Sequence, residues 1–226
     1  MRVRALIFDF DGLILDTEST EYQAIREVFA AHGCDLSFSL WADVIGRPRG
    51  YFDFHAYLEQ LSSAVIDREL IRSRRRARVR ELNLLQPVQP GVVDYLCKGR
   101  EMSLKMGVAS SSDRSWVCEH LERLGLLEHF EAVKCFEDTG SHKPDPAPYQ
   151  AVLDALDIPP GEAVAFEDSP NGVASAKAAG LFCVAVPNPV TRRLCLDQAD
   201  LCVESLAALP LESLLLRLSG SGGNNL

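Results

Sequence analysis

Four short apolar runs recur along the chain, and each is followed at once by polar residues or by proline. They span residues 5–8, 106–109, 163–166 and 182–186. Unalternated apolar runs of this length are typical of strands buried on both faces of a parallel sheet. The pattern therefore predicts four strands, which end before Asp9, Ser110, Glu167 and Pro187.

Helix-length amphipathic segments separate the last three runs. Residues 113–124 begin with Asp113 at the expected N-cap position, and apolar residues then repeat at helical spacing. Residues 147–156 follow two prolines, and residues 170–179 end before Gly180, a common helix stop. Alternation of this kind predicts an α/β fold with a doubly wound, mostly parallel Rossmann-like sheet, whose ligand binds at the carboxyl ends of the strands.

One gap in the alternation is too long for an ordinary crossover. The first run ends at Asp9 and the next strand is expected only near Leu104. Helix-like segments at 18–31, 51–61 and 67–85, with 86–91 as a return linker, fill the gap. We therefore expect a core domain of residues 1–16 and 89–218, an inserted α-helical cap domain of residues 17–88, and a flexible tail of residues 219–226.

Composition narrows the class of protein. A net charge of −9 argues against nucleic-acid binding, which needs a broad basic surface. The chain has neither a signal-like leader nor an apolar run of membrane-spanning length, so we expect a cytoplasmic protein that does not bind membranes. We also expect a monomer or weak dimer. Its seven cysteines form no C-x-x-C pair, which predicts reduced and mostly buried thiols.

Asp9 and Asp11 are the most informative residues of the chain. They follow the first apolar run and precede Gly12, which allows a sharp turn. Residues two apart on a strand face the same way, so we expect both carboxylates on one side of the strand end. Two anions this close resist joint ionisation unless they share a cation or a proton. A solvated turn is the competing interpretation of the pair alone.

Polar residues at the other strand ends extend this pair into a set. Ser110, Lys143 in a His-Lys-Pro-Asp-Pro segment, and Glu167-Asp168 are expected to meet Asp9 and Asp11 at one edge of the sheet. Oxygen ligands of this kind favour Mg²⁺, and a hydroxyl and a lysine can bind phosphate. Singly, these residues are also typical of helix caps, solvated loops and helix-dipole partners. Their joint occurrence favours a catalytic site.

The same segments resemble the four motifs of the haloacid dehalogenase superfamily of phosphohydrolases. Residues 8–18 (FDFDGLILDTE) resemble the first motif, residues 108–110 the second, residues 143–146 the third and residues 166–170 the fourth, in the family's order. The helical insert is similar to the cap of the subgroup that includes β-phosphoglucomutase, phosphoglycolate phosphatase and sugar-phosphate phosphatases.

This resemblance implies a role for each motif residue. Asp9 would attack phosphorus and form an aspartyl-phosphate, while Asp11 would act as general acid and base. Ser110 and Lys143 would bind the transferring phosphoryl oxygens. The implied Mg²⁺ ligands are the carboxylate of Asp9, the main-chain carbonyl of Asp11, Asp168 and, through a water, Glu167.

The resemblance also indicates the substrate, a small phosphorylated metabolite such as a sugar phosphate. Glu18, Arg49 and Ser111 are the expected substrate-binding residues, and Arg47 is a further candidate beside Arg49. Where β-phosphoglucomutase has a histidine at the start of the cap, this chain has Glu21, and no lysine precedes Lys98. Both departures favour a phosphatase over a phosphosugar mutase, which stays the alternative.

Two readings from other classes stay open. A phosphorelay receiver domain also combines an acidic metal site, a hydroxyl and a lysine on a parallel sheet, but it has no cap. A non-catalytic binding protein is the second alternative, although no motif position is lost here.

The arginine-rich stretch 72–80 is expected to form a solvated, salt-bridged helix face.

Overall fold

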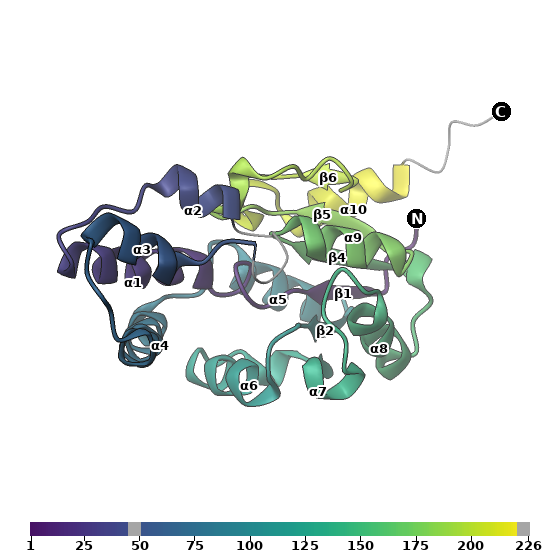
Figure 1. Ribbon diagram of the computed structural model, residues 1–226. Coiled ribbons are helices and arrows are strands. Elements are labelled where there is room, and N and C mark those ends of the chain that lie inside the picture. The colour runs from purple at the N-terminus through teal and green to yellow at the C-terminus, as the bar shows by residue number, and fades with distance from the viewer. Residues whose placement is uncertain (45–50, 221–226) are drawn as a thin grey trace.

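The computed structural model describes residues 1–44 and 51–220. Its centre is a six-stranded, all-parallel sheet in the order β3-β2-β1-β4-β5-β6, covered by helices on both faces (Figure 1). The strands are β1 (Ala5–Phe8), β2 (Lys105–Ala109), β3 (Ala132–Lys134), β4 (Ala163–Glu167), β5 (Phe182–Ala185) and β6 (Leu201–Cys202). The predicted doubly wound α/β fold is confirmed, and the four predicted strands correspond to β1, β2, β4 and β5.

Ten α-helices surround or extend this sheet in the described part of the chain. They are α1 (Thr17–Ala31), α2 (Phe38–Val44), α3 (Phe54–Ser62), α4 (Arg68–Leu85), α5 (Val92–Glu101), α6 (Arg114–Arg123), α7 (Phe136–Thr139), α8 (Ala147–Leu156), α9 (Pro170–Ala178) and α10 (Leu211–Gly220). Helices α8 and α9 match the predicted segments to within one residue. Helices α2, α5, α7 and α10 and the two short strands β3 and β6 were not predicted.

Alternate residues of the central strands bury themselves in two separate layers. Leu6 and Phe8 of β1 face a cluster completed by α5, α6 and α10, whereas Ala5 and Ile7 face a cluster completed by α8 and α9. All four side chains are fully buried. Burial on both faces explains why the strands read as continuous apolar runs in the sequence.

The helices α1 to α4 lie beyond the carboxyl ends of the strands, beside the core (Figure 1). They have a hydrophobic cluster of their own, to which Phe29, Trp41 and Leu58 contribute, and Val190 joins it from the segment after β5. An insertion with its own apolar cluster is what the long gap between the first two strands requires. The domain bounds at residues 17 and 88 stay a prediction.

Some local predictions differ from the structure. Asp113 precedes α6 but its side chain makes no capping hydrogen bond, and the Glu137 carboxylate accepts from the backbone N–H of Arg114 at the start of the helix. Ser219 and Gly220 close helix α10, where the sequence suggested a tail, since the apolar face of α10 continues to Leu218. The thiols are all free, but only Cys135 and Cys183 are buried.

We searched the helices at residues 1–44 and 51–220 for a segment that could cross a membrane and found none. None of them combines the length and the apolar character that a bilayer crossing requires.

One buried hydrogen bond joins α5 to the segment before α10 and gives a stability prediction. The Tyr95 hydroxyl donates to the Leu209 carbonyl at 2.5 Å. We expect Tyr95→Phe to lower the free energy of unfolding by about 1–2 kcal/mol, because it strands a buried acceptor. Tyr57→Phe is the control, because its hydroxyl makes no hydrogen bond within the described residues, and we expect a change below about 0.5 kcal/mol in urea titrations. Equal losses in both variants would contradict the assignment.

Candidate active site

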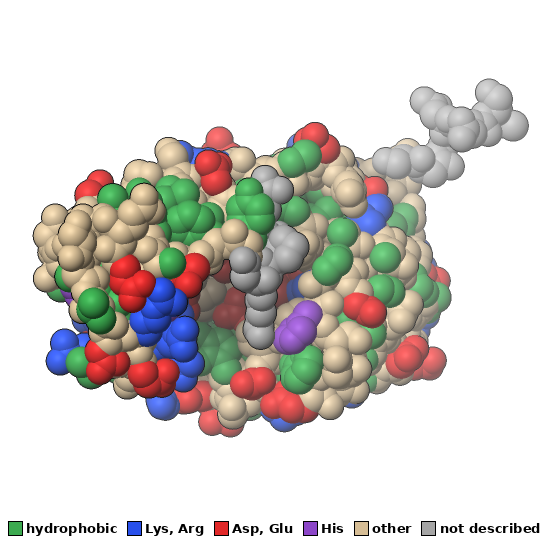
Figure 2. Space-filling view, in the orientation of Figure 1, with side chains coloured by type: hydrophobic (Ala, Val, Ile, Leu, Met, Phe, Trp, Pro, Cys, Tyr) green, Lys and Arg blue, Asp and Glu red, His purple; other side chains and the backbone are tan. Residues whose placement is uncertain are grey.

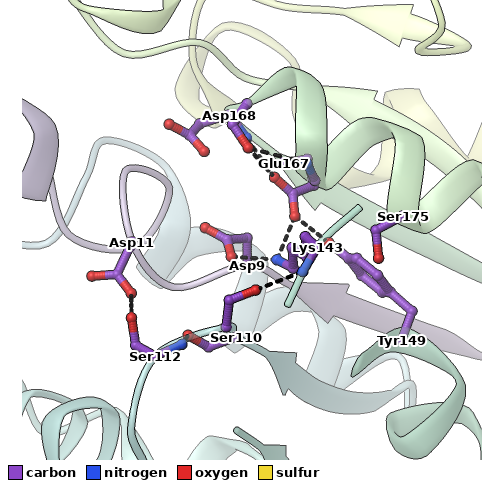
Figure 3. A network of polar contacts seen from close by, with 12 residues as sticks. Asp9, Asp11, Ser110, Ser112, Lys143, Tyr149, Glu167, Asp168 and Ser175 are labelled. Atoms are coloured by element: carbon purple, nitrogen blue, oxygen red, sulfur yellow. Dashed lines mark hydrogen bonds and ion pairs between the residues drawn. The ribbon is translucent and has the colours of Figure 1, made fainter. Parts of the chain in front are cut away.

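Lys143 lies at the centre of the site, between two carboxylates from neighbouring strands. Its Nζ is 2.5 Å from Asp9 Oδ1, at the end of β1, and 2.5 Å from Glu167 Oε1, at the end of β4 (Figure 3). Both carboxylate side chains are at least nine-tenths buried. The ends of separate strands therefore meet at one point, as predicted.

The loop after β2 holds the lysine segment in place. Ser111 Oγ accepts from the Lys143 backbone N–H at 2.9 Å, so this predicted substrate-binding residue positions the lysine loop in the structure. Ser110 lies fully buried at the end of β2, where its Oγ accepts from the Ser112 N–H at 3.0 Å. The ring of His142 stacks on Phe136 and faces the Ser111 carbonyl, outside the carboxylate cluster.

Glu167 is fully buried, and both of its oxygens have partners. The Tyr149 hydroxyl donates to Oε1 at 2.6 Å, and the Asp168 backbone N–H approaches Oε2 at 3.2 Å. Gly172 makes room for this carboxylate, since a Cβ there would stand 1.8 Å from Oε2. Glu167 is thus held in one orientation by α8, α9 and its own strand.

Asp168 completes a cluster of acidic oxygens. Asn188 donates to Asp168 Oδ2 at 2.7 Å, and one oxygen each from Asp9, Glu167 and Asp168 lie within 4.8 Å of one another. When all three acids are ionised, Lys143 balances one of the three negative charges, and a net charge of −2 remains among the described residues of the cluster. Hard oxygen donors with an uncompensated double charge fit a divalent cation.

The pKa values of the clustered groups reflect this excess of negative charge. Burial raises the pKa of Asp9 well above its ordinary value, although Lys143 acts in the opposite direction. Burial also raises the pKa of Asp168, and Asp9 and Glu167 add to the shift. Burial alone would lower the pKa of Lys143, but its two carboxylate partners outweigh burial and raise it. Without a further cation, burial therefore favours protonation of Asp9 and Asp168.

Asp11 does not point at this cluster. Its Oδ2 accepts from the Ser112 hydroxyl at 2.7 Å and its Oδ1 from the Trp116 indole N–H at 3.0 Å. Figure 3 shows its carboxylate turned toward Ser112. Strand β1 ends at Phe8, and Asp11 lies in the turn that leads to Gly12, which has φ +91°. Phe8 and Phe10 face one buried apolar cluster, as expected, and the Asp11 carboxylate bonds to Ser112 and Trp116 instead of to Lys143.

A cleft of about 680 Å³ begins at Asp11. It is lined by residues of α1, α4 and α6, among them Glu18, Arg76 and Trp116. Figure 2 shows the surface hollowed between the cap helices and the core, with acidic side chains inside the hollow. Burial, followed by the charges of Asp11 and Glu21, raises the pKa of Glu18 to about 7.

The arginines of α4 are mostly engaged in ion pairs, as the sequence indicates. Arg75 pairs with Glu21, Arg78 with Glu27 and Arg80 with Glu119. The predicted substrate-binding residue Arg49 and its neighbour Arg47 lie outside the described residues.

The chain is similar to known proteins in sequence and in fold. A sequence profile described as haloacid dehalogenase-like hydrolase matches residues 6–186. "Putative phosphatase YhcW" of Bacillus subtilis (strain 168) is 42% identical over 96% of this chain and 98% of its own length. Fructose-1-phosphate phosphatase YqaB of Escherichia coli (strain K12) is 30% identical over 82% of this chain and 97% of its own. The crystal structure of CbbY from Rhodobacter sphaeroides in complex with phosphate is 27% identical, with a TM-score of 0.70, and covers 94% of this chain and 99% of that chain.

Gly12 provides a test of how tightly the turn packs on the cluster. A Cβ there would stand 2.1 Å from Asp168 Oδ2 in addition to straining a positive φ, whereas at Gly33, with φ +69°, a Cβ would meet nothing within 4 Å. We expect Gly33→Ala to cost about 1 kcal/mol and Gly12→Ala about 3 kcal/mol of unfolding free energy, measured in urea. Similar costs would show that the turn does not press on Asp168.

Glu18 gives a pH-dependent prediction. Because its pKa is about 7 in the folded chain against 4.5 ordinarily, the folded state binds more protons, and unfolding free energy falls as pH rises through this window. The Glu18→Gln variant has no such pH-dependent loss of stability. Its unfolding free energy relative to that of the wild type should therefore increase between pH 4.5 and about 7 and then level off. Exposed Glu69→Gln is the control, and urea titrations at several pH values are the measurement. A flat difference for Glu18→Gln would contradict the shift.

Proposed function

Because the chain belongs to the haloacid dehalogenase-like hydrolases, we propose that it is a Mg²⁺-dependent phosphatase that hydrolyses a small phosphorylated metabolite through an aspartyl-phosphate on Asp9. The observation that carries this proposal is the position of Lys143 between Asp9 and Glu167, with Asp168 close enough to share a cation. A nucleophile, a cationic phosphoryl ligand and a metal site are thereby combined within one buried cluster.

In the first step, an Asp9 carboxylate oxygen forms a bond to phosphorus as the bond from phosphorus to the leaving oxygen breaks. The Lys143 ammonium orients Asp9 and balances charge on the phosphoryl oxygens, and the Ser110 hydroxyl donates to one of them. Asp11 gives a proton to the leaving oxygen. Asp11 then takes a proton from water, which attacks phosphorus, releases inorganic phosphate and restores the Asp9 carboxylate.

The residues that would hold Mg²⁺ are Asp9 and Asp168 through carboxylate oxygens, Asp11 through its main-chain carbonyl, and Glu167 through a water. The donor set fits a hard divalent cation, because in the described part of the chain Lys143 alone offsets the three buried acids. Bound there, the cation supplies charge neutralisation for the phosphoryl oxygens.

A sugar phosphate is the substrate class that the relatives and the cleft favour. One relative is named a fructose-1-phosphate phosphatase, and the CbbY structure holds phosphate. The cleft next to Asp11 is lined by Glu18, Glu21 and Asn83, whose polar groups suit the hydroxyls of a sugar. Ser111 and Arg49 complete the proposed substrate-binding set.

The local geometry of Glu21 favours hydrolysis over mutase activity. This residue replaces the histidine of the mutases and is engaged by Arg75 of α4. This ion pair joins α1 to α4 at the edge of the cleft. The mutase alternative predicts interconversion of β-glucose 1-phosphate and glucose 6-phosphate, which the phosphatase proposal does not.

A screen of phosphorylated metabolites at fixed Mg²⁺, with colorimetric detection of phosphate, tests the proposal. We expect turnover of one or more sugar phosphates, its loss on chelation with EDTA and its recovery on Mg²⁺ addition. Asp9→Asn should lower kcat by about 10³-fold or more, since it removes the nucleophile. Asp94→Asn, at an exposed position of α5, should leave kcat unchanged. Phosphate release that survives Asp9→Asn would refute the proposed mechanism.

A further inference from the structure

We propose that Trp116 is a positioning residue for Asp11, whose indole N–H holds the acid/base carboxylate toward the substrate cleft. This inference rests on the proposed function, because it assigns Asp11 to proton transfer. It adds a residue outside the four motif segments, which are residues 8–18, 108–110, 143–146 and 166–170. Trp116 lies on α6, which belongs to the core, and lines the same cleft as Asp11.

Two donors determine where the Asp11 carboxylate points. The Trp116 Nε1–H donates to Oδ1 at 3.0 Å, and the Ser112 hydroxyl donates to Oδ2 at 2.7 Å. Each oxygen therefore has its own donor, and the two bonds together define both the rotation and the tilt of the carboxylate. The result is an Asp11 that lines the cleft, where its carboxylate is turned toward Ser112 (Figure 3).

The chemistry of the two donors differs in a way that suits proton transfer. An indole N–H can only donate, whereas a serine hydroxyl can rotate and either donate or accept. The Trp116 indole therefore always acts as a donor to Oδ1, whereas the Ser112 hydroxyl can rotate and adapt to a change at Oδ2. Trp116 is thus the fixed partner of the pair, and it sets where the Asp11 carboxylate lies.

Trp116 is itself held by its surroundings. Its ring packs edge to face on His120, one turn later on α6, with centroids 4.3 Å apart. His120 is 1% exposed, and its Nδ1 faces Arg123 Nε at 3.3 Å. Arg123 also donates to the backbone carbonyl of Asn83, near the end of α4, at 3.1 Å. A tryptophan anchored in this way can impose an orientation on Asp11 rather than follow it.

The alternative is that Trp116 only fills space beside the cleft. A space-filling ring would support folding or substrate affinity. Its removal would then change kcat and KM by the same factor whether or not residue 11 is an aspartate. A positioning role predicts a loss that depends on Asp11. A double-mutant comparison separates the two roles.

The test measures kcat and KM with p-nitrophenyl phosphate at fixed Mg²⁺ for Trp116→Phe in the wild-type and Asp11→Ala backgrounds. We expect Trp116→Phe to lower kcat about tenfold in the wild-type background, since it removes one hydrogen bond to a carboxylate, with KM within about twofold. In the Asp11→Ala background, the same substitution should change kcat by less than about twofold. Trp41→Phe, at the second tryptophan, makes the same chemical change away from Asp11 and should leave kcat within about twofold.

An equal loss in both backgrounds, an unchanged kcat, or an effect confined to KM would overturn the inference. Should Trp116→Phe fail to fold, incorporation of β-(3-benzothienyl)alanine at position 116 in the Trp41→Phe chain keeps the ring shape and removes only the N–H. The same tenfold loss is expected there. The proposed function and this inference can fail separately. If Asp9→Asn keeps its activity, the proposed function is refuted. If Asp9→Asn is inactive but the effect of Trp116→Phe does not depend on Asp11, this inference alone is refuted.

Discussion

The buried contact of Lys143 with Asp9 and Glu167 is the interaction on which the rest of the site depends. Burying charged groups is costly, and the loss of one partner leaves the others uncompensated. Here the three groups come from β1, from the loop before α8 and from β4, so their attraction draws together segments more than a hundred residues apart. The hydroxyl of Tyr149 and the missing side chain of Gly172 then hold Glu167 where Lys143 needs it.

The sheet makes this meeting possible. In a parallel sheet all carboxyl ends lie at one edge, and β1 pairs with β2 on one side and with β4 on the other. The residues that follow these three strands are consequently neighbours before any side chain interacts. The inserted helices α1 to α4 lie beyond that edge (Figure 1). Two of them, α1 and α4, line the cleft next to Asp11 together with α6, so the cleft begins two residues after Asp9.

The sequence was sufficient to predict the elements whose signals are local and strong. Continuous apolar runs located β1, β2, β4 and β5, and the polar residues after them located Asp9, Ser110 and Glu167. Strand β6 has two residues and β3 has three, too few for a periodic pattern, and both were missed. The orientation of Asp11 depends on the turn at Gly12 and on donors a hundred residues away. No local pattern contains that information.

Three other residues of the site were missed for the same reason. Tyr149, Asn188 and Trp116 act through contacts with Glu167, Asp168 and Asp11, and in the sequence each looks like an ordinary helix or loop residue. The measurement that tests the account most directly is borohydride reduction of the enzyme during turnover, followed by peptide mass spectrometry. The account predicts homoserine at position 9, formed from the aspartyl-phosphate. Unmodified Asp9, or homoserine at another acidic position, would contradict it.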